Sequence, residues 1–241
     1  MSFYHEKVAL VTGANRGLGK AIVAALLAAG IKKVYAAARC SSSIKHADTR
    51  VVPIDCDITS VEQLERVKTQ VGDLNILINN AGRNAFGSIL TSELDGIQQD
   101  MAVNYLGTLN AIRALYPVIQ ANEQGHIVNV ISICALASMP GLGGYCASKA
   151  ALFSATQAIR AELKKVNVRV RVQGVIAGPL DTDMNEGLEI EMATPEVAAQ
   201  AIVAGIQLAD DEIYIDPVAL ESGRIWQRNP KQLEADFALF E

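Results

Sequence analysis

The sequence predicts an α/β fold, a doubly wound parallel sheet of about seven strands with helices on both faces. Short runs of β-branched residues alternate with longer helical stretches over the whole chain of 241 residues. Neither a linker nor a repeat nor a low-complexity segment interrupts this alternation. Because every parallel crossover needs a covering element, the order favours a single domain spanning residues 1–241.

Strands are expected where short apolar runs are bounded by turn residues. They fall at residues 8–11, 34–38, 51–55, 76–78, 126–132, 169–176 and 212–215. The last of these opens a C-terminal segment, residues 212–241, that continues as a polar helical end through Phe237.

The helices between the strands begin and end on characteristic residues. The first, at residues 21–29, can be capped by Gly30. The second, at residues 60–71, has Ser60 as a plausible N-cap and acidic residues in its first turns. Two longer helices are expected at residues 94–115 and 145–165.

Composition excludes several classes of protein. The net charge is −5, with acidic and basic residues mixed along the chain, so the basic face that nucleic-acid binding requires is not expected. No apolar run reaches the roughly 18 residues of a membrane span, and the N-terminal residues lack the apolar core of a signal peptide. We therefore expect a cytoplasmic protein.

The cysteines do not predict a metal site. They have no C-x-x-C spacing and no histidine cluster beside them, whereas a zinc site needs about four ligands in close register. Free thiols in a reducing compartment are the better interpretation. The four are Cys40, Cys56, Cys134 and Cys146.

Tyr145 and Lys149 form the most informative pair in the chain. Residues four apart on a helix share a face, so the ammonium can lie beside the phenol and is expected to lower a pKa that is about 10 in water. The Tyr-x-x-x-Lys pattern alone is weakly specific. Ser132 precedes Tyr145 by thirteen positions, which adds a second hydroxyl to the same candidate site.

A glycine-rich turn, residues 12–19, lies between the first strand and the first helix; we call it the phosphate turn. Its G-x-x-x-G-x-G spacing allows tight turning and close approach of the backbone to a pyrophosphate, with free amides at a helix N-terminus. The alternative is a glycine-rich connection without a ligand. The turn's candidate ligand-binding residues are Gly13, Asn15, Arg16, Gly17, Leu18 and Gly19.

Taken together, the phosphate turn, the segment Asn79-Asn80-Ala81-Gly82, Ser132, Tyr145 and Lys149 resemble the short-chain dehydrogenase/reductase family. The resemblance runs from residue 7 to residue 184, with the motifs in the family's order and spacing. It implies a Rossmann-type domain and an oxidoreductase with a nicotinamide cofactor.

The end of the second strand favours NADPH over NADH. An NAD site places a carboxylate there, but this chain has Ala38 followed by Arg39. Arg16 supplies another guanidinium within the phosphate turn, and two such groups suit a 2′-phosphate. The alternative is that one of them is a solvated surface arginine.

The resemblance also implies further cofactor contacts. Asp57 and Ile58 would contact the adenine. Residues 79, 81 and 82 would pass beneath the adenosine ribose, although this segment could instead only support the sheet. After the sixth strand, Ala177 replaces the family's usual proline. The remaining matched positions are Asn79, Ala81, Gly82, Gly178, Leu180 and Thr182.

The same resemblance assigns the chemistry. Tyr145 would be the general acid that protonates a carbonyl oxygen, while Lys149 would lower its pKa and bind the nicotinamide ribose. Ser132 would stabilise the charge on that oxygen. Asn104 would hold a water linked to the lysine.

Substrate and assembly are less clearly encoded. The substrate loop, residues 183–194, is short and apolar and predicts an open pocket for aromatic or bulky ketones and aldehydes. The opposite wall is expected at Ile133, Cys134, Met139, Pro140 and Leu142. The family resemblance implies a homodimer or homotetramer formed through the helices at 94–115 and 145–165. Leu233, Phe237 and Phe240 could dock on a partner subunit or on their own domain.

The leading interpretation is NADPH-dependent reduction of a ketone or aldehyde. One alternative is an NADP-dependent alcohol dehydrogenase working in the oxidative direction; Arg39 argues against it, because cells usually keep NADPH reduced. A second is a catalytically silent NADP(H)-binding sensor, against which the intact catalytic set argues. Sugar-nucleotide epimerases share the turn and the Tyr–Lys pair but need an additional substrate domain.

Overall fold

The computed structural model describes residues 3–122 and 124–239. Within these ranges the strands form one parallel sheet of seven, in the order β3-β2-β1-β4-β5-β6-β7, which confirms the predicted fold class. The strands are β1 Val8–Thr12, β2 Lys33–Ala38, β3 Val51–Asp55, β4 Ile76–Asn79, β5 Gly125–Val130, β6 Val170–Ile176 and β7 Glu212–Tyr214.

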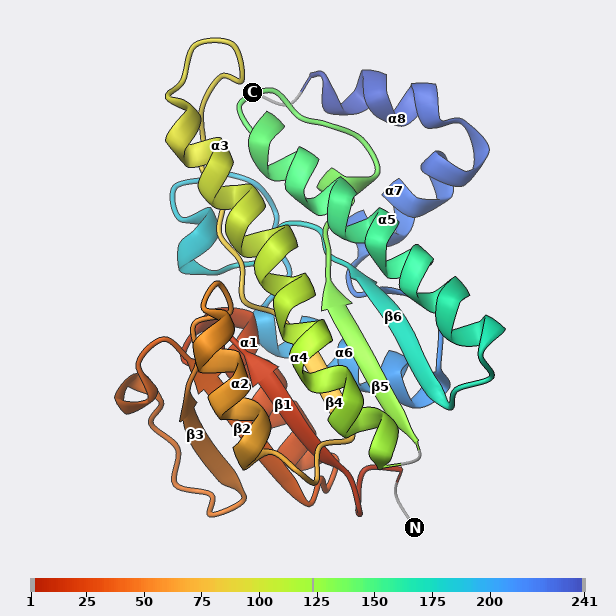
Figure 1. Cartoon of the computed structure of the whole chain (residues 1–241). Coiled ribbons are helices and arrows are strands. Elements are labelled where there is room, and N and C mark those ends of the chain that lie inside the picture. The colour runs from red at the N-terminus through yellow and green to blue at the C-terminus, as the bar shows by residue number, and fades with distance from the viewer. Residues whose placement is uncertain (1–2, 123, 240–241) are drawn as a thin grey trace.

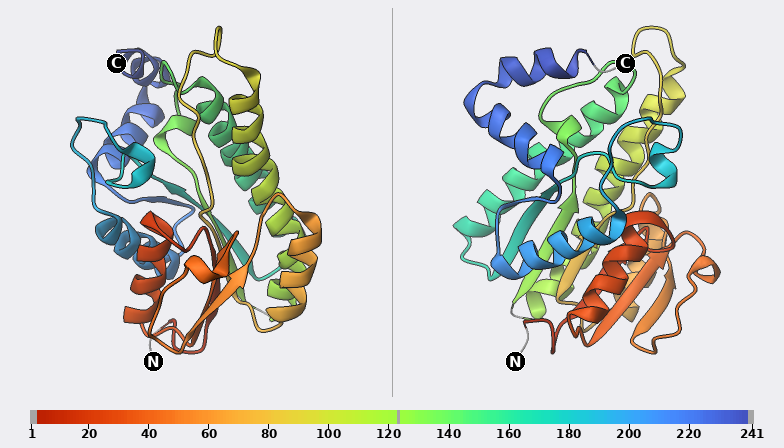
Figure 2. Two further views of the ribbon diagram at one scale, coloured as in Figure 1. Left: turned by 90° about the vertical axis from the view of Figure 1, so that its left-hand side faces the viewer. Right: turned by 180° about the vertical axis from the view of Figure 1, so that it is seen from behind.

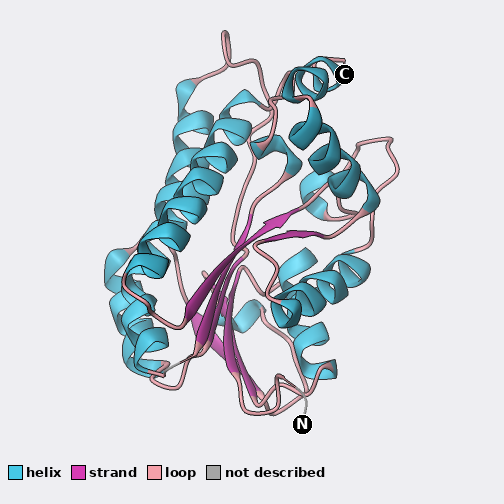
Figure 3. Cartoon of the chain, turned by 90° about the vertical axis from the view of Figure 1, so that its right-hand side faces the viewer, coloured by secondary structure: helices cyan, strands magenta, loops and turns pink. Residues whose placement is uncertain are grey.

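Helices cover both faces of the sheet (Figure 3). The apolar sides of α1 and α6 are buried with one face of the central strands, and those of α2, α4 and α5 are buried with the other. The helices are α1 Gly17–Ala28, α2 Val61–Gln70, α3 Leu94–Asp100, α4 Thr108–Ala121, α5 Gly143–Lys165, α6 Pro195–Leu208, α7 Pro217–Arg228 and α8 Pro230–Phe237. Short helical segments are η1 Ser41–Ser43, η2 Met101–Gly107, η3 Ile133–Ala135 and η4 Asp183–Asn185.

Local sequence signals explain most boundaries. The Ser60 hydroxyl accepts the backbone N–H of Gln63, as its N-cap assignment predicts. Gly30 follows α1 with φ +83°, a conformation that favours glycine. However, α1 begins at Gly17 and not at residue 21, because the last glycines of the phosphate turn already form its first turn.

The predicted helix at 94–115 is one continuous helical run that contains an irregularity. It consists of α3, a π-helical segment η2 and α4, and it continues to residue 121 with Pro117 inside α4. Asn104 lies in the π-helical part, and such segments are frequent at functional sites. The predicted helical end does run to Phe237, but it is divided at Asn229 into α7 and α8, because Pro230 starts a new helix with its own cap.

The topology places the site at one edge of the sheet. The strand order reverses between β1 and β4, with β2 and β3 on one side and β5, β6 and β7 on the other. The connections that leave β1 and β4 therefore turn to opposite faces of the sheet. A crevice opens between them at the carboxyl ends of these two strands. The phosphate turn, η3 and the start of α5 all meet this edge, and α3, α7 and α8 lie beyond it (Figures 1 and 2). Residues 3–122 and 124–239 contain no helix with both the length and the apolarity to cross a bilayer.

Candidate active site

The phosphate turn has the geometry of an anion-binding loop. Gly13 and Gly17 have φ of +66° and +49°, where a side chain would be strained. A Cβ on Gly19 would lie 2.1 Å from the carbonyl oxygen of Gly13. No side chain of the described residues caps the N-terminus of α1, and its first turn has no acidic residue. Its amides are therefore available to a phosphate.

Asn80 and Thr12 hold this turn in place. Thr12 Oγ1 accepts the backbone N–H groups of Asn80 and Ala81, both at 3.0 Å. In return, Asn80 Nδ2 donates to the carbonyl oxygens of Thr12 at 2.9 Å and Gly13 at 3.3 Å. Neither residue was predicted as part of the site, although Asn80 stands within the motif that was. The segment after β4 thus supports the phosphate turn directly.

The side chain of Asn79 turns away from the phosphate turn and toward the neighbouring strand β5. Its Nδ2 donates to Asn129 Oδ1 on β5 at 2.8 Å, and Asn129 Nδ2 donates to Thr156 Oγ1 on α5 at 2.9 Å. Successive side chains of a strand alternate between faces, so only one of the two asparagines can turn toward the phosphate turn. The contact of Asn79 with a cofactor stays a prediction, and it would have to be made by the main chain of Asn79.

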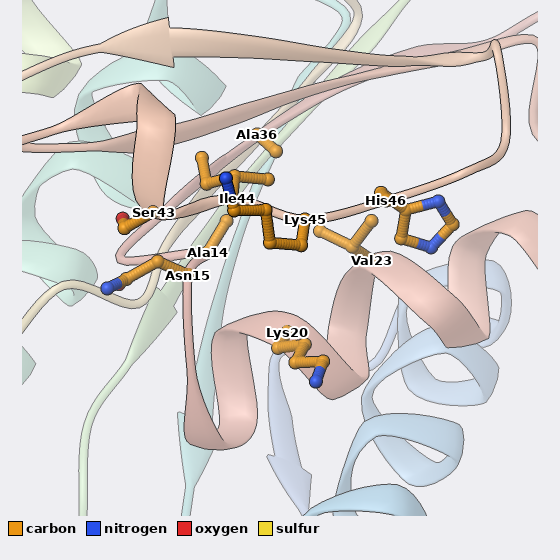
Figure 4. Close-up of a pocket in the computed structure, with 9 residues that line it drawn as sticks. All are labelled: Ala14, Asn15, Lys20, Val23, Ala36, Ser43, Ile44, Lys45 and His46. Atoms are coloured by element: carbon orange, nitrogen blue, oxygen red, sulfur yellow. The ribbon is translucent and has the colours of Figure 1, made fainter.

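The two candidate arginines lie in different surroundings. Arg39 is exposed directly after β2. Arg16 donates to Asp183 Oδ2 of the substrate loop at 2.7 Å, and both side chains are 68% exposed. Beside the turn lies a cavity of about 120 Å³ that runs from Asn15 and Ser43 to His46 (Figure 4). Its lining residues are Ala14, Asn15, Lys20, Val23, Ala36, Ser43, Ile44, Lys45 and His46.

Asp57 and Ile58 follow β3 at the same edge. Asp57 Oδ1 accepts the backbone N–H and the hydroxyl of Thr59 at 2.9 and 2.7 Å. Ile58 is buried, and a Cβ on Gly107 would lie 2.9 Å from its Cγ1, so this side chain packs closely against η2. Their predicted contacts with an adenine stay predictions.

Ser132, Tyr145 and Lys149 meet where β5 ends and α5 begins. Ser132 Oγ accepts the backbone N–H of Cys134 at 3.2 Å, and its hydroxyl lies near enough to the Tyr145 phenol to lower the pKa of that phenol. Lys149 Nζ donates to the carbonyl oxygen of Val130 at 2.9 Å and lies 5.6 Å from the centre of the Tyr145 ring. The structure therefore brings the three predicted catalytic side chains together.

The protonation states differ from the expectation. Burial raises the pKa of Tyr145 above its ordinary value, Cys134 raises it further, and the nearby Ser132 hydroxyl only partly opposes this. The expected lowering of the Tyr145 pKa is wrong, because desolvation of the phenolate is the largest effect and the nearby acidic groups add to it. Burial lowers the pKa of Lys149 itself to about 8, against the opposing effects of Cys134 and Asp100.

Asn104 is fully buried in η2 and braces the site. Its Nδ2 donates to the carbonyl oxygen of Arg83 at 2.8 Å and to Ser148 Oγ at 2.9 Å, and its Oδ1 accepts the Arg83 N–H at 2.9 Å. Both amide hydrogens are thus used by protein atoms. The predicted water contact would fall to the main chain of Asn104.

The segment after β6 folds over the phosphate turn. The Gly178 N–H donates to Asp216 Oδ2 at 2.7 Å, and Asp216 Oδ1 also caps α7 by accepting the Ala219 N–H at 2.8 Å. Leu180 is buried, and its carbonyl oxygen accepts Asn185 Nδ2 at 2.9 Å. A Cβ on Gly17 would lie 3.4 Å from the Thr182 methyl group. The main-chain carbonyl of Ala177, which stands where the family usually has proline, accepts the Ile133 N–H at 2.9 Å.

The expected pocket wall needs correction. Ile133, Cys134, Met139 and Leu142 are buried in a cluster with residues of α5, so they serve packing more than an open wall. Pro140 is exposed, as are Phe86 at 56% and Ile89 at 57% on the segment between β4 and α3.

The C-terminal apolar residues pack on their own domain. Leu233 is buried and Phe237 packs against the same cluster as α5. Phe240 lies outside the described residues. In the described part of the chain, no group of three or more His, Cys, Asp or Glu side chains could hold a metal ion.

Comparisons with known proteins agree with this geometry. The family model described as short chain dehydrogenase matches residues 7–193. An uncharacterised oxidoreductase of Staphylococcus saprophyticus is 32% identical over 88% of this chain and 98% of its own length. An NADP-dependent 3-hydroxy acid dehydrogenase of Schizosaccharomyces pombe is 26% identical over 92% and 95%.

A solved structure adds a close match in three dimensions. It is a short chain dehydrogenase from Burkholderia cenocepacia in complex with NADP, 38% identical, with a TM-score of 0.92 over 97% of this chain and 98% of that one. The chain therefore belongs to the short-chain dehydrogenase family of NAD(P)-dependent oxidoreductases.

Proposed function

We propose that the protein reduces a ketone or aldehyde to an alcohol with NADPH, with Tyr145 as the general acid. The observation that carries this proposal is the cluster in which the Tyr145 phenol lies beside the Ser132 hydroxyl, while Lys149 Nζ lies 5.6 Å from the centre of the Tyr145 ring. A phenol whose pKa is raised by burial stays protonated at neutral pH. That is the form a proton donor to a carbonyl oxygen needs.

The residues divide the work as follows. The bound nicotinamide would supply the hydride. Ser132 and Tyr145 together present two hydroxyl donors to the substrate oxygen, where negative charge develops. Lys149, held by the Val130 carbonyl, places positive charge beside the phenol and binds the nicotinamide ribose. Asn104 keeps the segment after β4 against this centre, and its main chain holds the water that returns a proton to Tyr145.

The preference for NADPH is supported by positive charge around the expected 2′-phosphate. Arg39 is exposed after β2, where an NAD-binding chain would have a carboxylate, and Arg16 stands in the phosphate turn. Lys20 and Lys45 line the cavity beside it. The relative from Burkholderia cenocepacia was solved with NADP.

The substrate class is supported by exposed apolar side chains around the site. Phe86 and Ile89 on one side, and Met184 and Ile190 on the substrate loop, are each more than a third exposed. Such a rim favours aromatic or bulky carbonyl compounds over small charged ones.

The test is a panel of ketones and aldehydes assayed with NADPH and NADH. Tyr145→Phe should keep its affinity for NADPH and lose nearly all reduction, whereas Tyr116→Phe, on α4 away from the site, should keep both. Full turnover by Tyr145→Phe would overturn the mechanism. Preference for NADH would refute the roles of Arg16 and Arg39. Activity confined to small charged carbonyls would refute the substrate class.

The same assay distinguishes carbonyl reduction from the two alternative functions, alcohol oxidation and cofactor binding without turnover. An NADP-dependent alcohol dehydrogenase would oxidise alcohols faster than it reduces their ketones at equal saturation near neutral pH. A silent NADP(H)-binding sensor would bind NADPH and turn over no member of the panel.

We also propose that the enzyme is a cytoplasmic homodimer or homotetramer formed through the run α3–η2–α4 and α5. Leu94 and Leu106 on this run are 64% and 50% exposed. Leu106→Lys should reduce the mass measured by light scattering to that of a monomer. Val61→Lys, on the exposed side of α2, should leave the mass unchanged.

A further inference from the structure

Asp100, at the end of α3, is a fully buried carboxylate that the mechanism above does not use, with 0% of its surface exposed. Its Oδ2 accepts the backbone N–H of Ala85 at 3.0 Å, and its Oδ1 lies 3.2 Å from Arg83 Nε. That ion pair lacks the alignment of a hydrogen bond, and among the described residues Oδ1 has no hydrogen-bond partner. Burying a carboxylate so incompletely satisfied costs free energy, which calls for a compensating role.

Asp100 and Asn104 both bind the segment formed by residues 83–85. The two residues are four positions apart on one helical run. Asn104 holds the N–H and the carbonyl oxygen of Arg83, while Asp100 holds its guanidinium and the N–H of Ala85. The segment is therefore fixed by both its main chain and a side chain.

This segment leads directly to the reacting centre. A Cβ built on Gly82 would lie 3.2 Å from Asn104 Oδ1 and 3.6 Å from Lys149 Nζ. Gly82 therefore lies directly between residues 83–85 and the side chain of Lys149. A shift of residues 83–85 would move the backbone against which Lys149 rests.

Charge connects the two groups as well. The groups that act electrostatically on Lys149 are Asp100 on α3 and Cys134 on η3, and Arg83 faces Asp100. Burial raises the pKa of Asp100, and the Ala85 amide, Arg83 and Lys149 oppose that change. The attraction is mutual, so an ionised Asp100 favours the ammonium form of Lys149.

We propose that Asp100 is a positioning residue for the Tyr145–Lys149 pair: it clamps residues 83–85 together with Asn104 and places a buried negative charge that keeps Lys149 protonated. This inference rests on the proposed function, because it assumes that the Lys149 ammonium is the working form. It assigns a role to a side chain outside the predicted catalytic set.

The test compares Asp100→Asn with Asp95→Asn, an exposed carboxylate on the same helix. Asparagine can still accept the Ala85 N–H but removes the charge. Two pH profiles are measured, kcat/KM for a carbonyl substrate and the dissociation constant of NADPH from its fluorescence. In Asp100→Asn the basic limb of both should move to lower pH by about one unit, since one nearby charge shifts a pKa by this order. Asp95→Asn should match the parent protein.

Asp100→Glu provides the rescue, because it keeps the charge but disturbs the packing: it should retain the basic limb near that of the parent even if its thermal midpoint falls. An unmoved limb in Asp100→Asn would overturn the proposal. So would a pH-independent loss of activity shared by Asp100→Asn and Asp100→Glu, which would indicate packing alone. Neither result affects the proposed function, which is tested separately by the carbonyl panel and by Tyr145→Phe.

Discussion

Arg16 of the phosphate turn donates to Asp183 of the substrate loop across 2.7 Å, joining two segments 167 residues apart in sequence. Arg16 is also one of the two guanidinium groups proposed to bind the 2′-phosphate of NADPH. A phosphate dianion would therefore compete with a carboxylate of the protein for the same cation. Since both side chains are 68% exposed, the pair is weak and can exchange partners.

We predict that Asp183→Asn binds NADPH up to about fivefold more tightly at low salt, as expected for release of an exposed ion pair worth about 0.2–1 kcal/mol. The gain should shrink at high salt, because screening weakens the competing attraction. Fluorescence titration with NADPH and NADH measures it. Glu186→Gln, an exposed carboxylate of the same loop, is the control. An equal gain for NADH would contradict competition at the 2′-phosphate.

Asn80→Ala should weaken binding of NADPH and NADH alike, by about ten- to thirtyfold. It removes two hydrogen bonds to the carbonyls of Thr12 and Gly13, and such bonds contribute on the order of 1 kcal/mol each. Asn122→Ala is a matched control, because its amide also binds backbone carbonyls, those of Gly72 and Leu74, but away from the site. A changed preference between the two cofactors would contradict a role in holding the turn.

Lys149→Met should stabilise the fold while abolishing turnover. Burial lowers the pKa of Lys149 from 10.5 to about 8, so below pH 8 the folded state bears the full cost of a desolvated ammonium. Replacing it should raise the free energy of unfolding by on the order of 3 kcal/mol near neutral pH. The gain should fade as pH rises from 8 toward 10.5, where the unfolded lysine also loses its proton.

Thermal unfolding of the two proteins between pH 6 and pH 10 measures this effect, at about 2–4 °C per kcal/mol. Lys164→Met, an exposed lysine on the same helix, should show no gain. A midpoint for Lys149→Met that falls at every pH would show that the bond to the Val130 carbonyl outweighs the desolvation of the ammonium.

Thiol reactivity should separate one cysteine from the other three. All four cysteines are described and free, and Cys40 alone is exposed. One thiol should react rapidly with a disulfide reagent in the folded protein, and three more only after unfolding. Cys40→Ser should abolish the rapid phase. The pKa of Cys146 is lowered, chiefly by its contact with the Cys134 thiol, so a second rapid thiol in Cys40→Ser would show that Cys146 is accessible.

The sequence patterns predicted those features of the site that depend on the spacing of residues along a single helix or strand. Tyr145 and Lys149 share a helix face because they are four apart, and Ser132 meets them because β5 and the start of α5 border the same crevice. The spacing could not show how far each group is buried. That is why the expected lowering of the Tyr145 pKa was wrong, since the environment that desolvates the phenol comes from several distant segments.

The sequence patterns also could not predict the direction in which each side chain of a motif points. The motif Asn79-Asn80-Ala81-Gly82 was recognised, but the strand's alternation decides that Asn80 holds the phosphate turn while Asn79 bonds to β5. Asp100 gave no signal at all, because an acidic residue on an amphipathic helix is ordinarily exposed. Only the fold, with residues 83–85 packed across α3, makes its burial apparent.

Gly178 and Asp216 illustrate a constraint that acts on both positions at once. The carboxylate receives the Gly178 N–H and caps α7, and a Cβ at position 178 would lie 2.4 Å from Asp216 Oδ1. Any larger residue at 178 therefore requires a shorter one at 216, and a shorter residue at 216 removes the cap of α7. The two positions should vary together among relatives, and a random-mutagenesis library should recover changes at 178 only as doubles.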